Sequence, residues 1–553
     1  MHIGGLIMGG RAVAPGEPCT RTRTRAMRCA GIRKVLLLSS FALLGVPMIA
    51  KAGADGDGPL SPFAVRTCDV YGKGFFRVSG TDGICAKVGG YVRADLAFGA
   101  WPNDRAFAGG QLDLNNQPLH TDETGIGTFM TRASGFVDAR LSTSYGTARA
   151  FLNGYVDAAG GEHIGGTTDS YADAVINRAF FQFSGFTVGE RQSNFDLLKR
   201  GFSYTPGWAR DPDSSSGTLL GAYTAHFGNG FSATLSLEDN SFRRNAVWAA
   251  GDTSLGIGEY PGPSTFGHNI PGTCIPSYLS VTSSEERCSI GAYESNSMPD
   301  IVGSLLYDQN WGAAQVAGAL HQIHAGFGGQ DFDRWGTAIG ADVDFKLPVT
   351  GPKDTLWLHV GFAQGASSYA GLGQFGGTGI FDRFDGTNVA AGWALDGIFS
   401  NTPGAPFGGS VVLPQAWDVK AAVEHYWTPA LRTSLFGGYS LWSPTDAGNS
   451  MMCSSPFGPV RTTAGALPNG ITPLPGCDFG FSVGTIGSRT IWNPVMHLDV
   501  GVEVMYTQIH TSFDPDRIRL NFGGGFGSTS GLYTPADEGV WSSLLRLQYN
   551  FYP

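Results

Sequence analysis

Few side chains in this sequence have the types and spacing that chemistry requires. His321 and His324 lie three residues apart on a predicted strand, which places their rings on opposite faces and disfavours a shared metal ion. The glycine-rich run 523–527 precedes no helix pattern and is interpreted as a flexible loop rather than a phosphate-binding loop. The chain contains no H-E-x-x-H, Walker A, G-x-S-x-G or EF-hand spacing. The sequence therefore predicts no enzyme activity, no cofactor and no metal.

The cysteines beyond residue 52 predict disulfides. They fall into three sequence-local pairs, Cys68 with Cys85, Cys274 with Cys288 and Cys453 with Cys477. Bonding within each pair is the simplest hypothesis because short loops cost least entropy to close, although six cysteines permit fifteen connectivities. A metal site is weakly supported, since no C-x-x-C or Cys/His cluster occurs. Disulfides indicate an oxidising compartment.

The N-terminus carries an export signal. Arg28, Arg33 and Lys34 precede an apolar run over 35–49, and Ala-Lys-Ala follows at 50–52. This arrangement is typical of a secretory signal peptide, and the run is shorter than the ~20 residues needed to span a bilayer. We predict that residues 1–52 are removed, that 1–26 extend beyond a natural start at Met27, and that 53–553 form one domain.

Composition excludes several classes of function. Removal of residues 1–52, which hold eight basic residues and one acidic residue, leaves 28 basic and 45 acidic residues. An acidic protein repels phosphate, so nucleic acid is not an expected partner. No second apolar stretch of helix-spanning length follows, so a mature membrane protein would have to be a closed barrel. At this point a secreted soluble β-protein remains open.

Alternation with a period of two is the main structural signal. In residues 132–142 the odd positions are apolar or small, and most even positions are polar or charged. Residues 147–158 repeat the pattern after a turn at Tyr145-Gly146, and it recurs in 86–96, 431–441, 498–506 and 545–551. A strand sorts such a pattern onto two faces. The sequence therefore predicts long, two-faced strands.

A soluble sandwich buries its apolar face, whereas a membrane barrel turns that face to lipid and its charges to a wet lumen. Three features favour the barrel. Arginine and aspartate share the polar faces, the strands are long enough for a tilted membrane span, and aromatic residues lie at strand ends, as in an interfacial girdle. These aromatic residues are Trp101, Tyr145, Trp427, Tyr439, Tyr506 and Trp541.

Short and long connections alternate along the chain. Short turns are predicted at 228–230, 310–312 and 428–429, and long connections at 101–130, 195–217, 240–297, 367–410 and 444–479. Periplasmic turns and extracellular loops of outer-membrane barrels differ in this way. The predicted fold is an all-β, transmembrane antiparallel β-barrel of about 16 strands.

Several segments resemble a known family. Residues 68–85 followed by 87–93 closely resemble the mature N-terminus of the alphaproteobacterial porins, the family of Brucella and rhizobial general porins. Residues 223–239, 424–429, 492–494, 501–506 and 550–553 are similar too. The resemblance implies a sixteen-stranded trimeric porin of the outer membrane, whose third extracellular loop folds inward to narrow a passive channel for small hydrophilic solutes and ions.

Within this resemblance, the loop 195–217 is the expected constriction. It carries Asp196, Asp211 and Asp213, but also Lys199, Arg200 and Arg210, so anion or cation preference stays open. The facing wall is expected to be formed by lumen-facing arginines, whose field would orient solutes. Alternatively, some of these arginines only pair with Asp95, Asp138 or Asp157. The candidates are Arg93, Arg132, Arg140, Arg149 and Arg178.

The expected partners are outer-membrane lipid and lipopolysaccharide, two further copies of the chain, and the barrel-assembly machinery through the C-terminal strand 545–553. The long connection 240–297 is a candidate lid or trimer contact. A substrate-selective channel is the nearest alternative, because Phe136, Phe151 and Tyr155 are candidates for the start of an aromatic ladder in the lumen. An outer-membrane enzyme and a secreted adhesin are more distant alternatives.

Overall fold

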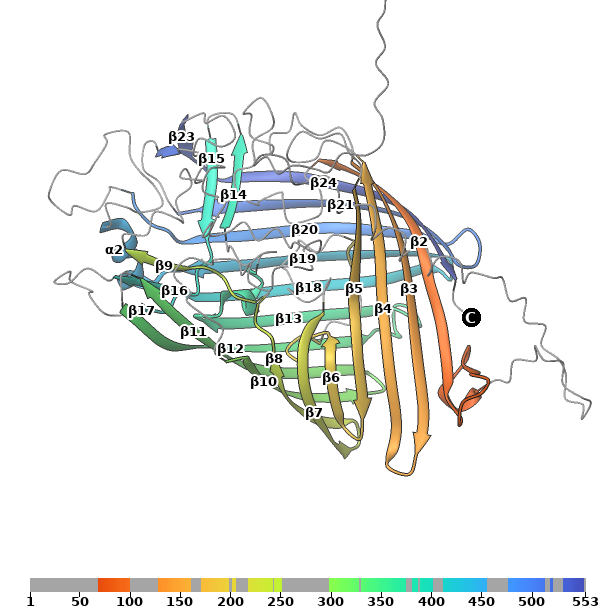
Figure 1. The fold of residues 1–553 in the computed structure, drawn as a ribbon. Helices are drawn as coiled ribbons and strands as arrows, with labels where there is room; N and C mark the ends of the chain where they lie inside the picture. Colours follow the sequence, from red (N-terminus) through yellow and green to blue (C-terminus); the bar gives the residue numbers. More distant parts are fainter. Residues whose placement is uncertain are drawn as a thin grey trace, which may run out of the picture. The chain divides into compact units, whose positions relative to one another are not determined.

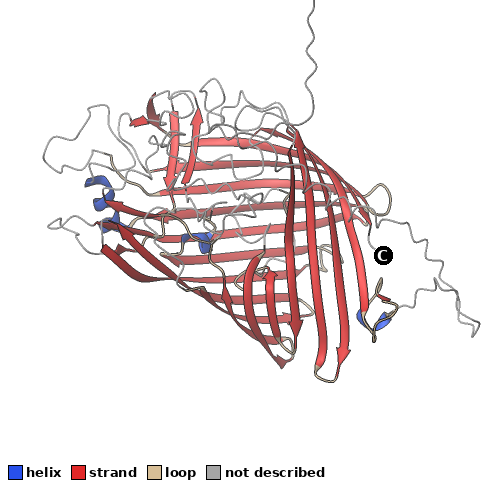
Figure 2. Ribbon diagram, viewed as in Figure 1, coloured by secondary structure: helices blue, strands red, loops and turns tan. Residues whose placement is uncertain are grey.

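The computed structural model describes residues 68–99, 128–160, 171–197, 201–204, 217–241, 243–250, 298–327, 330–373, 380–385, 388–400, 411–454, 476–512, 518–520 and 531–551. All of them belong to one compact unit, residues 66–553. Most are strands that run side by side in one curved sheet (Figures 1 and 2). The predicted signal peptide, Trp101, Asp211, Asp213, Cys274, Cys288 and the run 523–527 lie outside the described residues.

The sheet closes on itself. Every barrel pairing is antiparallel between neighbours in the chain order, and pairing of the last strand with β2 completes the ring. Among the described residues sixteen strands form it: β2 (Cys85–Gly99), β3 (Thr128–Thr143), β4 (Gly146–Gly160), β5 (Tyr171–Phe183), β6 (Phe186–Arg191), β7 (Thr218–Gly228), β8 (Phe231–Glu238), β10 (Asp300–Gln309), β11 (Gly312–Phe327), β12 (Gln330–Lys346), β13 (Thr355–Gln364), β18 (Gln415–Thr428), β19 (Leu431–Ser443), β20 (Phe481–Trp492), β21 (Leu498–Thr511) and β24 (Glu538–Phe551). The predicted strand number is confirmed.

The period-two pattern sorts as predicted for a membrane barrel. Val88 and Val92 on β2, Val137 on β3 and Leu152 on β4 are exposed on the outside. Their neighbours Arg93, Arg132, Asp138 and Arg149 point inward, where they pair with one another's strands. An apolar outer face and a charged inner face are what lipid outside and water inside require.

The two ends of the barrel differ as predicted. Tight turns join β3–β4, β5–β6, β7–β8, β10–β11 and β18–β19, with left-handed residues such as Ser184 and Asn229 where the chain reverses. At the other end most connections are long. The connection β11–β12, only residues 328–329, is an exception that alternation did not reveal. Strand β5 also begins earlier than the expected Arg178, at Tyr171.

Aromatic side chains mark the strand ends. Tyr145, Trp427 and Trp492 are exposed near the tight turns, and Trp541 is exposed near the opposite end. Tyr506 and Trp541 contact each other at 5.0 Å between ring centroids. These positions suit amphipathic rings at the two membrane interfaces, and the predicted girdle residues Tyr145, Trp427, Tyr506 and Trp541 all fit.

A short N-terminal segment lies beside β2. The 3-10 helix η1 (Asp69–Tyr71) and strand β1 (Phe76–Arg77) precede it, and β1 pairs with β2. The disulfide between Cys68 and Cys85 ties this segment to the start of the barrel, which confirms the first predicted pairing.

The long connections are more ordered than the sequence indicated. They contain 3-10 helix η4 (Ser367–Ala370), helix α2 (Thr445–Ser454) and short strands. Trp248, Trp393 and Trp442 are fully buried in a shared apolar core. The short strands are β9 (Val247–Ala250), β14 (Ile380–Asp385), β15 (Asn388–Trp393), β16 (Gly397–Ser400), β17 (Val411–Val412), β22 (Ile518–Leu520) and β23 (Gly531–Pro535).

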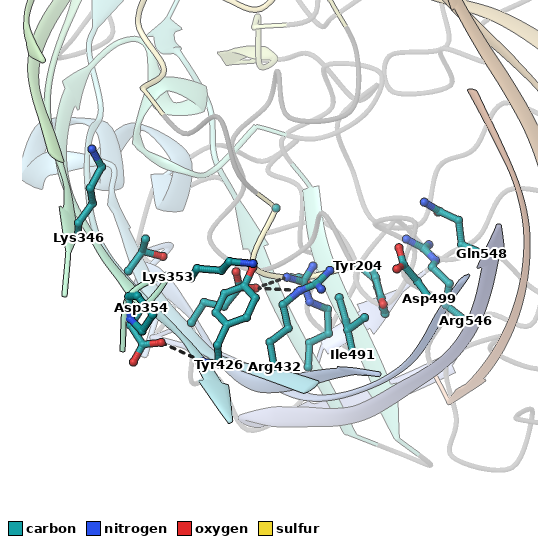
Figure 3. Close-up of a pocket in the computed structure, with 16 residues that line it drawn as sticks. Tyr204, Lys346, Lys353, Asp354, Tyr426, Arg432, Ile491, Asp499, Arg546 and Gln548 are labelled. Carbon is teal, nitrogen blue, oxygen red and sulfur yellow. Dashed lines mark hydrogen bonds and ion pairs between the residues drawn. The ribbon is translucent and has the colours of Figure 1, made fainter. Parts of the chain in front are cut away.

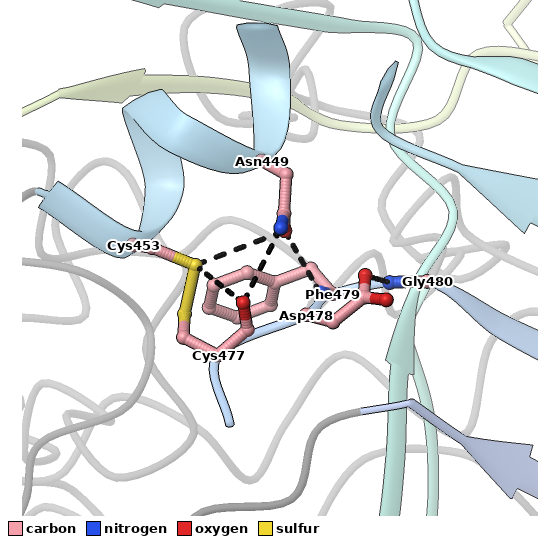
Figure 4. The surroundings of a disulfide bond; sticks show 6 residues. All are labelled: Asn449, Cys453, Cys477, Asp478, Phe479 and Gly480. Carbon is pink, nitrogen blue, oxygen red and sulfur yellow. Dashed lines mark hydrogen bonds between the residues drawn. A yellow bond between two sulfur atoms is a disulfide. The ribbon is translucent and has the colours of Figure 1, made fainter. Parts of the chain in front are cut away.

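A second disulfide fixes part of this core. Cys453 at the end of α2 is bonded to Cys477, as predicted (Figure 4). Asn449 of the same helix donates to the Cys477 carbonyl at 3.3 Å and accepts from the Phe479 amide at 2.9 Å. The segment before β20 is thereby held against the helix. Of the helices that the structure describes, none has the length and apolar character that crossing a membrane would need.

Candidate functional site: the lumen and its third loop

The third long connection, residues 192–217, is attached to the inside of the barrel; we call it the third loop. At its start, Gln315 of β11 donates to the carbonyls of Asn194 (3.2 Å) and Phe195 (3.0 Å). The buried ring of Phe195 lies against Gly340 of β12, where a Cβ would come within 3.0 Å of the ring. A glycine is therefore required on the wall where the loop begins to turn inward.

Residues 201–204 form a second attachment of the third loop. The carboxylate of Glu503 on β21 accepts from the Ser203 hydroxyl (3.0 Å) and the Tyr204 amide (2.5 Å). The ring of Phe202 is buried with Trp357, Ala422, Phe436 and Met505, which come from four different strands. The predicted inward fold of this loop is thus present in the structure.

Tyr204 stands at the inner end of the described part of the third loop. Its ring lies 4.1 Å from the Arg546 guanidinium and 5.0 Å from that of Arg489. A side chain at Gly501 would collide with its hydroxyl. Burial raises the pKa of Tyr204 to about 12, although the nearby guanidinium groups of Arg489 and Arg546 act against this, so the phenol is neutral at physiological pH.

The predicted arginines lie on the far wall, about half the ring away from the strands that hold the start of the third loop. Arg132 of β3 makes two 2.5 Å hydrogen bonds to Asp157 of β4, and its guanidinium covers the Tyr155 ring at 3.6 Å. Arg140 and Arg149 share the single carboxylate of Asp138. The predicted pairing with Asp138 and Asp157 is therefore correct for these three arginines.

The remaining predicted residues behave differently. Arg93 forms an ion pair with Asp95 at 3.2 Å, and Arg178 donates to the Asn177 carbonyl at 2.6 Å. Asp196, expected to face the pore, instead binds Arg243 at 2.6 Å at the root of the third loop, where both side chains are mostly buried. Its charge is neutralised there, because this ion pair ties the third loop to the next long connection.

The two predicted strand histidines do lie on opposite faces. His321 is fully buried between Asp300 (2.8 Å) and Asp396 (3.6 Å), whereas His324 pairs with Asp333. Burial raises the pKa of Asp396, although the His321 ring and two backbone amides act against this. In the described part of the chain, no group of three or more His, Cys, Asp or Glu side chains is arranged to hold a metal ion.

An aromatic strip crosses the inner wall near the middle of three strands. Phe136, Phe151 and Phe180 stack in series, with centroid distances of 6.1 and 5.2 Å. Tyr155, the third residue expected in a ladder, lies under Arg132 instead. The guanidinium of Arg149 covers both Phe151 and Phe180 at 5.2–5.3 Å, so their faces are already occupied. A ladder that slides solutes along open ring faces is not favoured by this arrangement.

Below the third loop, on the side of the tight turns, is a cavity of about 710 Å³. Gly201, Ser203 and Tyr204 form one side of it, and β18–β21, β24 and the β12–β13 turn form the rest (Figure 3). It contains charged residues that were not singled out in the sequence, although alternation had placed Arg432 and Arg546 on the polar face. These are Lys346, Lys353, Asp354, Glu424, Arg432, Arg489, Asp499 and Arg546.

A closed sixteen-stranded barrel with lipid-facing apolar residues, a charged lumen and an inward loop is the structure of an outer-membrane channel. The family model described as "Porin subfamily" matches residues 61–521, so the chain belongs to the porin subfamily.

Known proteins agree with this assignment. The chain is 28% identical to the porin Omp2b of Brucella suis over 62% of its own length and 77% of that protein. It is 27% identical to the porin Omp2b of Brucella melitensis over the same shares. Its fold is similar to that of the outer membrane channel DcaP of Acinetobacter baumannii, with a TM-score of 0.50, 14% identity, and coverage of 86% of this chain and 99% of that one.

The protein is therefore a porin of the bacterial outer membrane that forms a passive channel for solutes. Its family indicates a channel rather than an enzyme.

Proposed function

We propose that the channel narrows to an eyelet between the third loop and the arginine-bearing wall of β2–β5, and that small hydrophilic solutes and ions diffuse through it. The observation that carries this proposal is the double attachment of the third loop, at Gln315 and at Glu503, which extends the loop across the inside of the barrel. The wall opposite the first attachment carries Arg93, Arg132 and Arg178. Asp211 and Asp213 of the same loop remain candidates for the acidic side.

Liposome swelling with sugars of increasing size tests the eyelet. Arg132→Ala and Arg178→Ala together are expected to admit larger sugars, because two long side chains leave the narrowest section. Lys87→Ala is the matched control, since Lys87 lies on β2 near the tight turns and bonds the Lys73 carbonyl at 3.3 Å. Wild-type swelling rates for every sugar in the double variant, with the barrel still heat-modifiable on a gel, would contradict the eyelet.

We further propose that the chain works as a homotrimer that packs through β6–β8. β6 has six residues, so it is about 20 Å long and, when tilted, does not cover an apolar band of ~25 Å. Val188 and Leu235 are 59% and 62% exposed on this low part of the wall. An apolar hollow of about 440 Å³ lies beside them, lined by Gly189 and Gly221 among others. Protein from a second copy would cover what this short wall leaves open.

Leu235→Arg tests the trimer. A charge on this outer face is expected to convert trimers to monomers in native gels and cross-linking experiments, because an arginine would have to be desolvated in the contact. Ile486→Arg is the control, as Ile486 is 67% exposed on β20. Trimers of unchanged stability in Leu235→Arg would remove β6–β8 from the interface.

The remaining partners follow from the outer-membrane location. We propose that lipid and lipopolysaccharide surround the apolar belt and that the barrel-assembly machinery recognises the terminal strand β24, whose outer face carries Leu545, Leu547, Tyr549 and Phe551. Residues 1–52 are proposed to act as the export signal, with 1–26 as an upstream extension. Mass spectrometry of the mature N-terminus tests this, and a start at Gly53 is expected.

A further inference from the structure

The ion pairs of the lumen expose their two partners unequally. In the pair Arg140–Asp138 the side-chain exposures are 27% and 8%, and in Arg432–Glu424 they are 23% and 12%. Arg93 is 13% exposed while its partner Asp95 is fully buried. A solute in water therefore meets the guanidinium groups of these pairs more than the carboxylates.

Acidic residues on the other side of the barrel are buried. Asp300, Asp342 and Asp418 have exposures of 3% or less, and they bind the histidines and the lysine around them. Glu503 is also buried, and it holds the third loop. These carboxylates contribute little to the surface that a passing ion contacts, because protein covers them.

The cavity below Tyr204 repeats this inequality. Its three acids are engaged from behind: Asp354 by the Tyr426 amide and His425, Glu424 by Ser434 and Arg489, and Asp499 by Asn493 and Asn550. Five basic side chains line the same cavity. Two of these are committed to acids, since Arg546 is bidentate with Asp95 and Arg489 binds Glu424.

Lys353 and Arg432 converge on one ring. Their charged groups lie 5.4 and 5.9 Å from the centroid of Tyr426, and Figure 3 shows the three side chains together at the cavity wall. Lys353 is exposed, and within the part of the chain that the structure describes it forms no ion pair. Arg432 donates to Asn493 at 3.0 Å and is 3.7 Å from Glu424. Two cations thus flank one ring at the edge of a water-sized chamber.

We propose that the pore prefers anions and that Lys353 and Arg432 form a docking place for a small, multiply charged anion of the phosphate class. The inference rests on the proposed channel function and names the solute class that the same lumen favours. An ammonium beside a guanidinium supplies several donors to one anion, and charge-assisted hydrogen bonds of this kind are the strong ones. The cavity of about 710 Å³ holds such an anion together with part of its hydration.

Planar-bilayer recording with two probes tests the proposal. In a potassium chloride gradient, the reversal potential should show chloride to be more permeant than potassium. Inorganic pyrophosphate, added on both sides, should reduce the chloride current in a concentration-dependent way. In the double variant Lys353→Gln/Arg432→Gln, the half-blocking concentration should rise roughly tenfold through loss of two charge-assisted contacts.

Lys87→Gln is the matched control, because it removes one basic lumen residue outside the cavity and should leave the pyrophosphate block unchanged. A conducting wild type that prefers potassium, or equal block in wild type and the double variant, would overturn the anion site while leaving the channel function intact. A folded barrel without any conductance would overturn the channel function and the site together.

Discussion

Removal of the Glu503 carboxylate is expected to release the third loop from the barrel wall. Glu503 is 1% exposed, and its two oxygens accept from the Ser203 hydroxyl at 3.0 Å and from the Tyr204 amide at 2.5 Å. Glu503→Ala leaves both donors without their partner. Tyr204 would then be held mainly by its contacts with Arg489 and Arg546.

The size of the effect follows from the two hydrogen bonds. A hydrogen bond to a charged group contributes about 1.5–3 kcal/mol. Water in the lumen can replace part of the loss, so we take the lower end for each bond, about 3 kcal/mol in all. That shifts the balance between attached and released loop by roughly a hundredfold. Glu503→Gln should give a smaller shift, because its amide oxygen still accepts one bond.

Single-channel recording measures this shift. Glu503→Ala is expected to give a changed mean conductance and frequent transitions between levels, because the loop moves in the conducting section. Asp499→Asn is the control, since Asp499 lies on the same strand but binds Asn493 and Asn550 rather than the loop. Wild-type conductance and wild-type current noise in Glu503→Ala would refute the attachment.

Three further changes have defined outcomes. Replacing Cys453 and Cys477 by serine opens a link over a separation of 24 residues, which costs roughly 3 kcal/mol; hydrogen exchange in helix α2 should accelerate while that of the barrel strands stays unchanged. Phe202→Ala should cost about 3–5 kcal/mol of local packing, seen as altered fluorescence of tryptophan beside it. Burial favours a raised pKa for Asp354, but hydrogen bonds from the Tyr426 amide and His425 outweigh it and lower the pKa. The attachment of the β12–β13 turn should therefore hold above pH ~4 and weaken as pH falls below it, and Asp354→Asn should abolish that pH dependence in hydrogen exchange of the turn.

The barrel was predictable from sequence because lipid and water impose opposite demands on alternate residues. Residues 132–142 and 545–551 obey the period-two rule along their length, and the structure places their apolar positions outside. Tight turns such as 228–230 were predictable for a similar reason, since a two-residue reversal needs residues that accept positive φ.

The long connections were less predictable, because their structure depends on distant partners. Strand β16 pairs with β9 across some 150 residues, and Trp248, Trp393 and Trp442 meet only in the folded chain. Alternation does not report such contacts. It also gives no sign that residues 328–329 alone connect β11 to β12.

The candidate site was predicted in part. The lumen-facing arginines were identified because they share the polar face of long strands. Asp196 was expected to face the pore, but its role depends on Arg243, which lies in a different connection. The attachment residues Glu503 and Gly501 carried no separate signal, because their importance comes from the third loop reaching across the barrel.

The central claim is that this barrel encloses a water-filled, passive pore. The measurement that tests it most directly is single-channel conductance of the refolded, detergent-extracted protein in planar bilayers over a range of salt concentrations. Conductance that rises in proportion to salt, in steps that often come in threes, is the predicted result. A folded, heat-modifiable barrel that inserts without giving any conductance would contradict it.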